Sequence, residues 1–390
     1  MKYLIVNNGS ASKKYAFYDG DKKIYSAHFE VENGGQIVTE TIGNSPIKKS
    51  ITQKDFVKAV EYVIDSLIVN KIVESKKDIS TVGIRIVAPG NYFLQNKIID
   101  NEYLKMAKAT LEKVPLHLGP ALEEIVKIKK ALGNKQKIVG VSDSAFHSTI
   151  PEYARLYAIP IKDSRRLNLY RFGYHGISVQ SVVSKAKATL GSLPEKVVIC
   201  HLGGGASVTA VKNGQSIDTS MGFTPLEGLV MATRVGDIDA GAVLYLAEKL
   251  KKNYKQLEQY FNNECGLLGL SGGKNSGVRE LVEAEIKGDA DSALVLKIYA
   301  NRLKQYIGRM SVVLGGIDLL IFAGTVGERS FVMRGKVCDG LQFLGIDLDA
   351  DVNNKSEGID VEISKAGSKT KVLVVKTDEM VEIAKVTSGF

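Results

Sequence analysis

Two segments of this 390-residue chain, one in each half, repeat the same order of elements, and this repetition constrains the fold more than any other feature. In residues 4–20, an apolar strand ends in a small-residue turn, and a second strand runs to an Asp19-Gly20 turn. In residues 198–214, the same order ends at Asn213-Gly214. Each segment reads as strand, turn, strand, hairpin turn and strand. One such turn fits an ordinary hairpin, but two similar segments predict a duplicated domain.

The rest of the chain alternates strand-length apolar stretches with helix-length amphipathic stretches, which is typical of an α/β protein. We expect strands at 2–6, 81–87, 137–141, 196–201, 318–323 and 371–376. We expect helices at 55–69, 121–131, 238–250, 291–315 and 378–385.

Composition narrows the class of protein. Hydrophobic residues at 44% and charged residues at 24% are typical of a folded globular chain rather than a disordered one. The 52 basic and 43 acidic residues give a net charge of +9, but the lysines occur as short dispersed pairs rather than a basic stripe. We therefore expect anionic small molecules as ligands and no nucleic acid partner.

Three further features indicate a cytoplasmic protein without a membrane partner. No apolar run of about 18 residues occurs, and the first strand turns polar at Asn7. The three cysteines, Cys200, Cys265 and Cys338, lack zinc-site spacing, so we expect free thiols in packed positions.

An apolar run at 319–323 ends in a turn that Gly324 and Gly327 bracket before a helix begins. Such a turn suits a nucleotide, because the backbone can lie against base and sugar while the helix start attracts negative charge. Neither a GxxxxGK[ST] loop nor a GxGxxG after the first strand is present, which argues against P-loop and Rossmann enzymes.

Polar residues at three further places are candidates for catalysis or for binding an anionic substrate. His175 lies between Gly173 and Gly176 and can donate to a phosphoryl oxygen, although a lone histidine is more often structural. Residues 218–239 are rich in hydroxyls, carboxylates and glycine, and include Arg234, whose alternative role is a surface salt bridge. Arg85 interrupts an apolar strand and needs an anionic partner, either an internal carboxylate or a bound substrate.

Asp143, just after the strand at 137–141, can hold Mg²⁺ through water or cap the following turn.

The ordered set of motifs resembles the acetate kinases and their propionate and butyrate kinase relatives, which are acyl kinases of the actin, sugar-kinase and Hsp70 superfamily. The matching segments run in order along the chain: Asn7-x-Gly9-Ser10-x-Ser12-x-Lys14, Pro115-Leu116-His117, Asp143 to His147, Gly173 to Gly176, His201 to Ser207, Asp218 to Asp239, Gly266 to Gly272, Ala323 to Glu328 and Thr377-Asp378-Glu379. The match from Asp218 to Asp239 is the most specific.

The resemblance implies a role for each matching residue. It implies a catalytic set of Arg85, Asp143, His175 and Arg234. It places the acyl substrate at Arg85, Val87, Leu116, His117, Tyr174 and Pro225. It places the nucleotide at Asn7, Ser10, Ser12, Lys14, His201, Gly203, Gly205, Ser207, Arg279, Gly324, Gly327 and Glu328. It places the metal ion, Mg²⁺ or Mn²⁺, at Asn7 and Glu379, with ATP as co-substrate.

The chain also departs from the family pattern. Ile84 and Ala88 stand where the family has histidines before and after the arginine. Gly204 replaces an asparagine in the second phosphate turn, and Tyr174 replaces the usual phenylalanine. Gly277 stands in place of a carboxylate that contacts the nucleotide, which leaves the phosphoryl donor open among ATP, GTP and pyrophosphate.

The resemblance implies a duplicated ribonuclease-H-like fold with an active-site cleft between the domains. We expect a first domain at 1–147, completed by a helix near 378–390, and a second at 148–377. The expected activity is reversible, Mg²⁺-dependent transfer of the ATP γ-phosphoryl group to acetate or propionate. The expected assembly is a homodimer. The alternatives are a pyrophosphate-linked acyl kinase and a nucleotide-binding protein of the same fold without catalysis.

Overall fold

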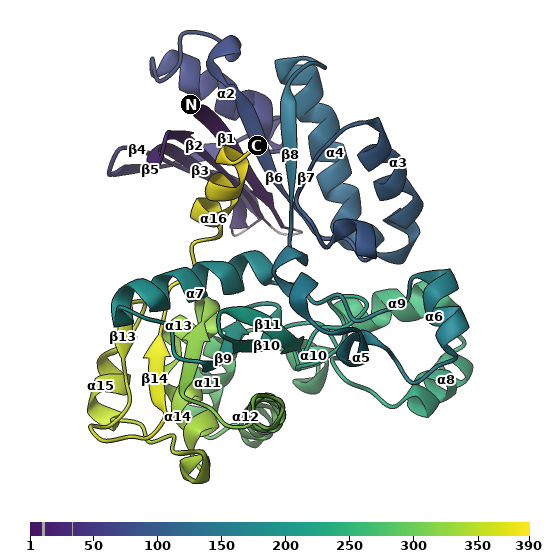
Figure 1. The fold of residues 1–390 in the computed structure, drawn as a ribbon, viewed down its shortest axis with the longest axis vertical. Coiled ribbons are helices and arrows are strands. Elements are labelled where there is room, and N and C mark those ends of the chain that lie inside the picture. The colour runs from purple at the N-terminus through teal and green to yellow at the C-terminus, as the bar shows by residue number, and fades with distance from the viewer. Residues whose placement is uncertain (10–11, 33) are drawn as a thin grey trace. The chain divides into compact units, whose positions relative to one another are not determined.

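Two mixed sheets, each covered by helices, make up the computed structural model, which describes residues 1–9, 12–32 and 34–390 (Figure 1). The chain divides into two compact units: residues 1–145 with 378–390, and residues 146–377. The strand repetition predicted from the sequence is confirmed, since β1-β2-β3 and β9-β10-β11 are both antiparallel meanders.

Within the described residues, the sheet of the first unit has eight strands in the order β5-β4-β3-β2-β1-β6-β8-β7. The strands are β1 (Lys2–Asn8), β2 (Ser12–Asp19), β3 (Lys22–Glu32), β4 (Gly35–Ile42), β5 (Ser45–Ile51), β6 (Thr81–Ile86), β7 (Lys97–Ile98) and β8 (Lys137–Ser142). The helices are α1 (Gln53–Val57), α2 (Ala59–Val69), η1 (Lys76–Asp78), η2 (Asn91–Phe93), α3 (Asn101–Thr110), η3 (Leu111–Lys113), α4 (Pro115–Leu132) and α16 (Glu379–Ser388).

The second unit, over the residues that the structure describes, has six strands in the order β11-β10-β9-β12-β14-β13. The strands are β9 (Lys196–Leu202), β10 (Ala206–Lys212), β11 (Gln215–Thr219), β12 (Leu319–Ala323), β13 (Val361–Glu362) and β14 (Lys371–Val374). The helices are η4 (Ala145–Thr149), which begins at the last residue of the first unit, α5 (Glu152–Arg155), α6 (Ile161–Leu167), α7 (Gly176–Leu190), α8 (Ala240–Lys249), α9 (Tyr254–Asn263), α10 (Gly266–Leu270), α11 (Val278–Ile286), α12 (Ala290–Leu314), α13 (Gly324–Arg329), α14 (Phe331–Cys338), η5 (Gln342–Leu344) and α15 (Ala350–Lys355).

The two faces of the first sheet carry different helices because side chains alternate along a strand. Val82 and Ile84 of β6 face the apolar core that α2 and α4 complete. Gly83 faces α16 instead, where a Cβ atom at position 83 would lie 2.0 Å from the Thr387 hydroxyl oxygen. Figure 1 shows the yellow helix α16 lying against the purple N-terminal strands of this unit.

The second sheet repeats this arrangement with α7 as the covering helix. Val179 and Val182 of α7 pack against Val197 and Ile199 of β9 in one core cluster. His201 follows these residues at the same alternation, so it also faces α7. Ser207 of β10 pairs directly with His201 and lies on the same face.

Two expectations about local structure are wrong. The single helix expected at 55–69 is split at Lys58, because a capping box between Thr52 and Asp55 starts the short helix α1 early and the backbone leaves helical angles at Lys58. The helix expected at 121–131 begins earlier, at Pro115, which is well tolerated at a helix start, so His117 lies in the first turn of α4.

The structure also bears on the cysteines and on the length and polarity of the helices. The three cysteines are free thiols, with Cys200 and Cys338 buried. Among the described helices, none is both long and apolar enough to cross a bilayer.

Candidate active site

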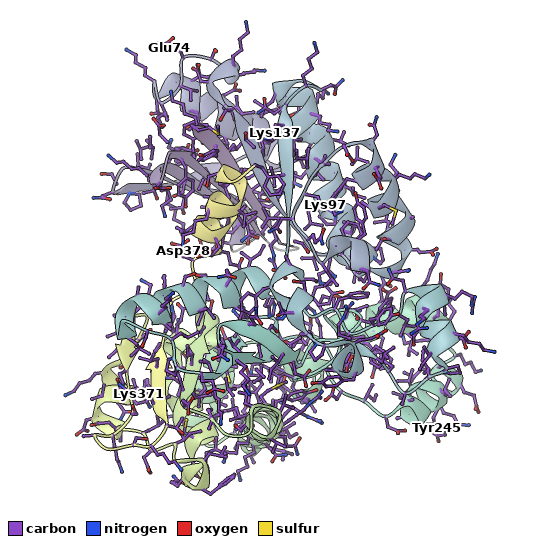
Figure 2. The ribbon with its side chains drawn as sticks, viewed as in Figure 1. Glu74, Lys97, Lys137, Tyr245, Lys371 and Asp378 are labelled. Atoms are coloured by element: carbon purple, nitrogen blue, oxygen red, sulfur yellow. The ribbon has the colours of Figure 1, made fainter. Side chains whose placement is uncertain are left out.

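The first unit brings four of the predicted site residues together at one edge of its sheet. Asn7, Arg85 and Asp143 lie at or just after the carboxyl ends of β1, β6 and β8, which run parallel to one another. Glu379 is the first residue of α16, and the preceding Asp378, labelled in Figure 2, caps this helix by accepting a hydrogen bond from the Val381 amide. All four side chains therefore meet on the face that α16 covers.

Arg85 is the centre of this cluster. Its Nε and Nη2 donate to the two carboxylate oxygens of Asp143, at 3.2 and 2.9 Å. Its Nη1 lies 3.4 Å from Asn7 Oδ1 and 4.0 Å from Glu379 Oε2, while Asn7 Nδ2 donates to the same Glu379 oxygen at 2.6 Å. Asp143 is fully buried. Of the two partners that the sequence left open for Arg85, the internal carboxylate is present.

Charge in this cluster favours a cation. Burial by itself lowers the pKa of the Arg85 guanidinium, but Asp143 and Glu379 outweigh burial and raise it above the usual value, so Arg85 stays charged. The two carboxylates exceed the single guanidinium by one negative charge.

The donor set fits Mg²⁺. Carboxylate and amide oxygens are its preferred protein ligands, and it usually takes only one or two carboxylates besides water and substrate phosphates. Within the described residues, no group of three or more His, Cys, Asp or Glu side chains could hold a metal ion, so a bound Mg²⁺ would need the Asn7 amide, water or phosphate as further ligands.

The second unit gathers two histidines at the start of α7. His175 is the residue before α7 and adopts a left-handed backbone with φ of +61°. Its Nδ1 shares a hydrogen bond of 3.1 Å with the Ser207 hydroxyl, and its ring centroid lies 4.4 Å from that of His201. His201 Nδ1 in turn lies 2.7 Å from the Ser178 hydroxyl, in the first turn of α7.

Gly205 marks the point where the second unit presents positive and hydrogen-bonding groups together. A Cβ atom at this position would lie 3.2 Å from His175 Nε2 and 3.3 Å from Arg234 Nη1. Both nitrogens therefore face the same small volume beside a residue that has no side chain. When Nδ1 of the neutral ring accepts from the Ser207 hydroxyl, Nε2 carries the proton, and the two nitrogens can then donate to the oxygens of a phosphoryl group.

The loop that carries Arg234 is held by hydrogen bonds rather than by regular structure. Arg234 Nη1 donates to the Pro225 carbonyl at 3.3 Å. Farther along, the Gly228 amide donates to Asp237 Oδ1 at 2.9 Å. The Tyr174 hydroxyl donates to the Phe223 carbonyl at 2.6 Å, which ties this loop to the segment that precedes His175.

The turn predicted for a nucleotide opens α13. Gly324 has φ of +74°, and a Cβ atom there would lie 2.7 Å from the Leu202 carbonyl oxygen, so the turn packs tightly against the end of β9. Glu328 Oε1 accepts from the amides of Gly324 and Thr377, each at 3.1 Å. Its carboxylate therefore holds the turn together.

The remaining predicted residues are distributed over both units. Lys14 is exposed on β2, and the Ser12 carbonyl accepts from the Gly9 amide at 2.9 Å, whereas Ser10 lies outside the described residues. Arg279 is exposed and paired with Glu283 at 2.9 Å. Of the predicted acyl-site residues besides Arg85, the first unit carries Val87, Leu116 and His117, and the second carries Tyr174 and Pro225.

Two residues that support the site were not predicted to have a role. Ser178 shares a hydrogen bond with His201. The sequence signal that could have identified Ser178 was its spacing of three residues from His175, which places the two residues near each other at the start of a helix. Arg334 is buried and donates to the Gly327 carbonyl at 2.8 Å and to the Asn353 side chain at 2.8 Å, which anchors the nucleotide turn from behind. No sequence signal marked Arg334, because its partners lie in two other helices, α13 and α15, that only the fold brings beside it.

Comparison with known proteins identifies the family of this chain. A sequence profile described as the Acetokinase family matches residues 2–385. An acetate kinase of Bacteroides thetaiotaomicron is 39% identical, with 98% of each chain covered, and an acetate kinase of Clostridium acetobutylicum is 37% identical, with 99% of this chain and 98% of that protein covered.

Solved structures show the same relationship. The crystal structure of Porphyromonas gingivalis acetate kinase superposes with a TM-score of 0.87 at 33% identity, covering 100% of this chain and 99% of that one. A propionate kinase from Francisella tularensis superposes with a TM-score of 0.90 at 30% identity, with the same coverage. Fold and similarity together define a phosphotransferase that acts on a carboxyl group. The chain belongs to the acetokinase family.

Proposed function

We propose that this enzyme reversibly transfers the γ-phosphoryl group of ATP to acetate or propionate, giving an acyl phosphate and ADP, with Mg²⁺ or Mn²⁺ bound. The observation that carries the proposal is the convergence of His175 Nε2 and Arg234 Nη1 beside Gly205. Two hydrogen-bond donors around a position without a side chain are what a phosphoryl group in transfer requires. The predicted acyl, phosphoryl and nucleotide residues are divided between the two units.

The acceptor requires little activation. A carboxylate is already charged at neutral pH, so transfer needs positioning and charge neutralisation rather than a strong base. Arg234 and His175 donate to the equatorial oxygens of the phosphoryl group. Arg85, held by Asp143, keeps its Nη1 beside Asn7 and Glu379, where it offers positive charge to the acceptor or to the phosphoryl oxygens.

A bound Mg²⁺ ion would be held by Asn7 and Glu379, with Asp143 acting through water, and would neutralise phosphate charge. Arg85 already donates to both oxygens of Asp143, so Asp143 does not compete with Asn7 and Glu379 for direct contact with this ion. Glu379 has its Oε2 bonded to the Asn7 amide, which fixes the carboxylate in one orientation.

The nucleotide is assigned to the second unit together with the first small-residue turn. The turns at 203–205 and 324–327 place backbone close to a ligand without side chains in between. Glu328 and Arg334 hold the second of these turns in place.

A direct assay tests the proposal. Purified enzyme is incubated with acetate, propionate or butyrate and with ATP, GTP or pyrophosphate, and acyl phosphate is trapped as the hydroxamate. We expect acetyl and propionyl hydroxamate with ATP. Product with pyrophosphate alone would instead support the pyrophosphate-linked alternative, and no product with any pair would leave a nucleotide-binding protein without catalysis.

We also infer that the enzyme works as a cytoplasmic homodimer. Helix α8 has no buried side chain, and its Leu244 and Tyr245 are 73% and 61% exposed (Figure 2). Such apolar exposure on a whole helix fits a face that a second copy covers. Sedimentation equilibrium should give twice the 42.3 kDa chain mass, and Leu244→Asp should shift the enzyme toward the monomer. A wild-type monomer at micromolar concentration would overturn this inference.

A further inference from the structure

The backbone just before α7 adopts left-handed conformations at two positions, which contacts with the surrounding residues must stabilise. Gly173 has φ of +74°, and His175 has φ of +61°. A left-handed backbone is easy for glycine but costs free energy for a residue with a side chain, and it persists where surrounding contacts hold it. The direction of the His175 ring depends on this backbone.

His147 makes contacts that hold this backbone. It lies in η4, in the second unit, and is fully buried. Its Nε2 lies 3.0 Å from the Tyr174 carbonyl oxygen, and its Nδ1 lies 2.8 Å from the Ser216 hydroxyl of β11. Because a carbonyl oxygen can only accept, Nε2 carries the proton and donates. In the neutral ring, Nδ1 then accepts from Ser216.

The ring of His147 also packs on the same segment. A Cβ atom at Gly173 would lie 2.8 Å from the His147 Cδ2 atom, so the segment approaches the ring as closely as a glycine allows. The Thr149 hydroxyl donates to the Ser216 carbonyl at 2.8 Å, which fixes η4 to β11 a second time. His147 is therefore anchored on one side and holds the Tyr174–His175 peptide on the other.

We propose that His147 is a positioning residue for phosphoryl transfer: its Nε2–H group fixes the peptide before His175 and so directs the His175 ring toward Arg234. His147 acts through the backbone and does not contact the reacting groups. The inference rests on the proposed role of His175 in the reaction. It assigns a function to the histidine of the 143–147 segment, which the proposed mechanism does not use.

Two isosteric variants separate positioning from packing. The amide nitrogen of glutamine can reach the place of Nε2, whereas that of asparagine reaches only the place of Nδ1. We expect His147→Gln to keep kcat within about threefold of wild type, because it still donates to Tyr174. We expect His147→Asn to lower kcat at least thirtyfold while the KM values for ATP and acetate stay within about twofold.

Combination with His175→Ala provides the decisive test. If His147 acts through His175, then His175→Ala should lower kcat strongly in the wild type and little further in the His147→Asn background. Equal losses in the Gln and Asn variants, or losses that multiply in the double variant, would overturn the proposal. Should His147→Asn fail to fold, Ser216→Ala replaces it with the same coupling test, because it removes only the anchor of Nδ1.

A readout without activity keeps this inference separate from the proposed function. The chain has five histidines, so selective ¹⁵N-histidine labelling gives a tractable spectrum. We expect His147 as the Nε2–H tautomer, and we expect the His175 ring signals to move in His147→Asn but not in His147→Gln. An Nδ1–H tautomer for His147 would overturn the proposal even if the enzyme proved inactive, whereas inactive wild-type enzyme with the expected spectra would overturn only the function.

Discussion

The carboxylate of Asp143 accepts hydrogen bonds from both Nε and Nη2 of Arg85, at 3.2 and 2.9 Å, across 58 positions of sequence. Asp143 is fully buried and the Arg85 side chain is 18% exposed. Removing one partner of a buried pair leaves a charge without compensation, which costs about 3–5 kcal/mol. We therefore expect Asp143→Ala to lower the free energy of unfolding by about that amount in urea titrations.

The double variant Arg85→Met with Asp143→Leu extends this prediction. It removes both charges together and should recover most of the lost stability, because an apolar pair avoids the cost of desolvation. It should remain inactive, since the Nη1 group beside Asn7 and Glu379 is gone. Full activity in the double variant would contradict a role for Arg85 in the reaction.

Arg234 is expected to act mainly in the transition state, where charge on the equatorial oxygens redistributes. Arg234→Ala should lower kcat on the order of 10³, the scale of arginine fingers in phosphoryl transfer, with little change in melting temperature. Arg234→Lys should rescue poorly because it lacks the planar fork. Near-normal kcat in Arg234→Ala would give this arginine a structural role only, through contacts such as its hydrogen bond with the Pro225 carbonyl.

Tyr174 is predicted to line the acyl pocket and so to limit the length of the acyl chain that the enzyme accepts. Acetate and propionate should differ by no more than about tenfold in kcat/KM, the range that one methylene commands, and butyrate should be poorer. The Tyr174 hydroxyl bonds to the Phe223 carbonyl, so Tyr174→Phe should cost about 1 kcal/mol of stability and relax the discrimination against butyrate. Tyr153→Phe, at an exposed position of α5, is the control. A wild-type preference for butyrate would contradict this account of the pocket.

Glu40 should make stability depend on pH. Burial by itself raises the pKa of its carboxyl, but hydrogen bonds from Ser66, Lys49 and Tyr25 outweigh burial and lower the pKa below its usual range. A pKa that is lower in the folded state stabilises the protein above the unfolded value, and this stabilisation disappears as pH falls through the folded value.

Glu40→Gln tests this dependence. The variant should lose roughly 1–3 kcal/mol of unfolding free energy near neutral pH, and its difference from wild type should shrink below about pH 4. Glu32→Gln, at an exposed pair with Lys48, should change stability little at any pH. A difference for Glu40→Gln that stays constant down to about pH 3 would contradict the assignment.

Much of the fold is visible in the sequence because the repeated strand and turn order is local. The Asp19-Gly20 and Asn213-Gly214 turns indicate hairpins. The strand-length apolar stretches predict β6, β8 and β12. The break at Lys58 is not visible, because the apolar periodicity of 55–69 continues through it. Helix periodicity reports which face is buried, not where the axis bends.

The candidate site was harder to predict, because a residue type does not reveal its partner. The resemblance assigns Ser207 to the nucleotide, and the sequence did not reveal that this residue is fully buried and bonded to His175 Nδ1. Arg85 had two possible anionic partners, and only the folded sheet brings Asp143 beside it. The roles that the resemblance implies for these residues stay predictions until the variants are measured.

The most direct test of the account is the reverse reaction followed by luciferase, in which enzyme, acetyl phosphate, ADP and Mg²⁺ are mixed and ATP is counted. The account predicts rapid ATP formation by the wild type, none in excess EDTA, and a loss on the order of 10³ in kcat for Arg234→Ala. ATP formation that persists undiminished in EDTA, or wild-type enzyme that forms no ATP from acetyl or propionyl phosphate, would contradict it.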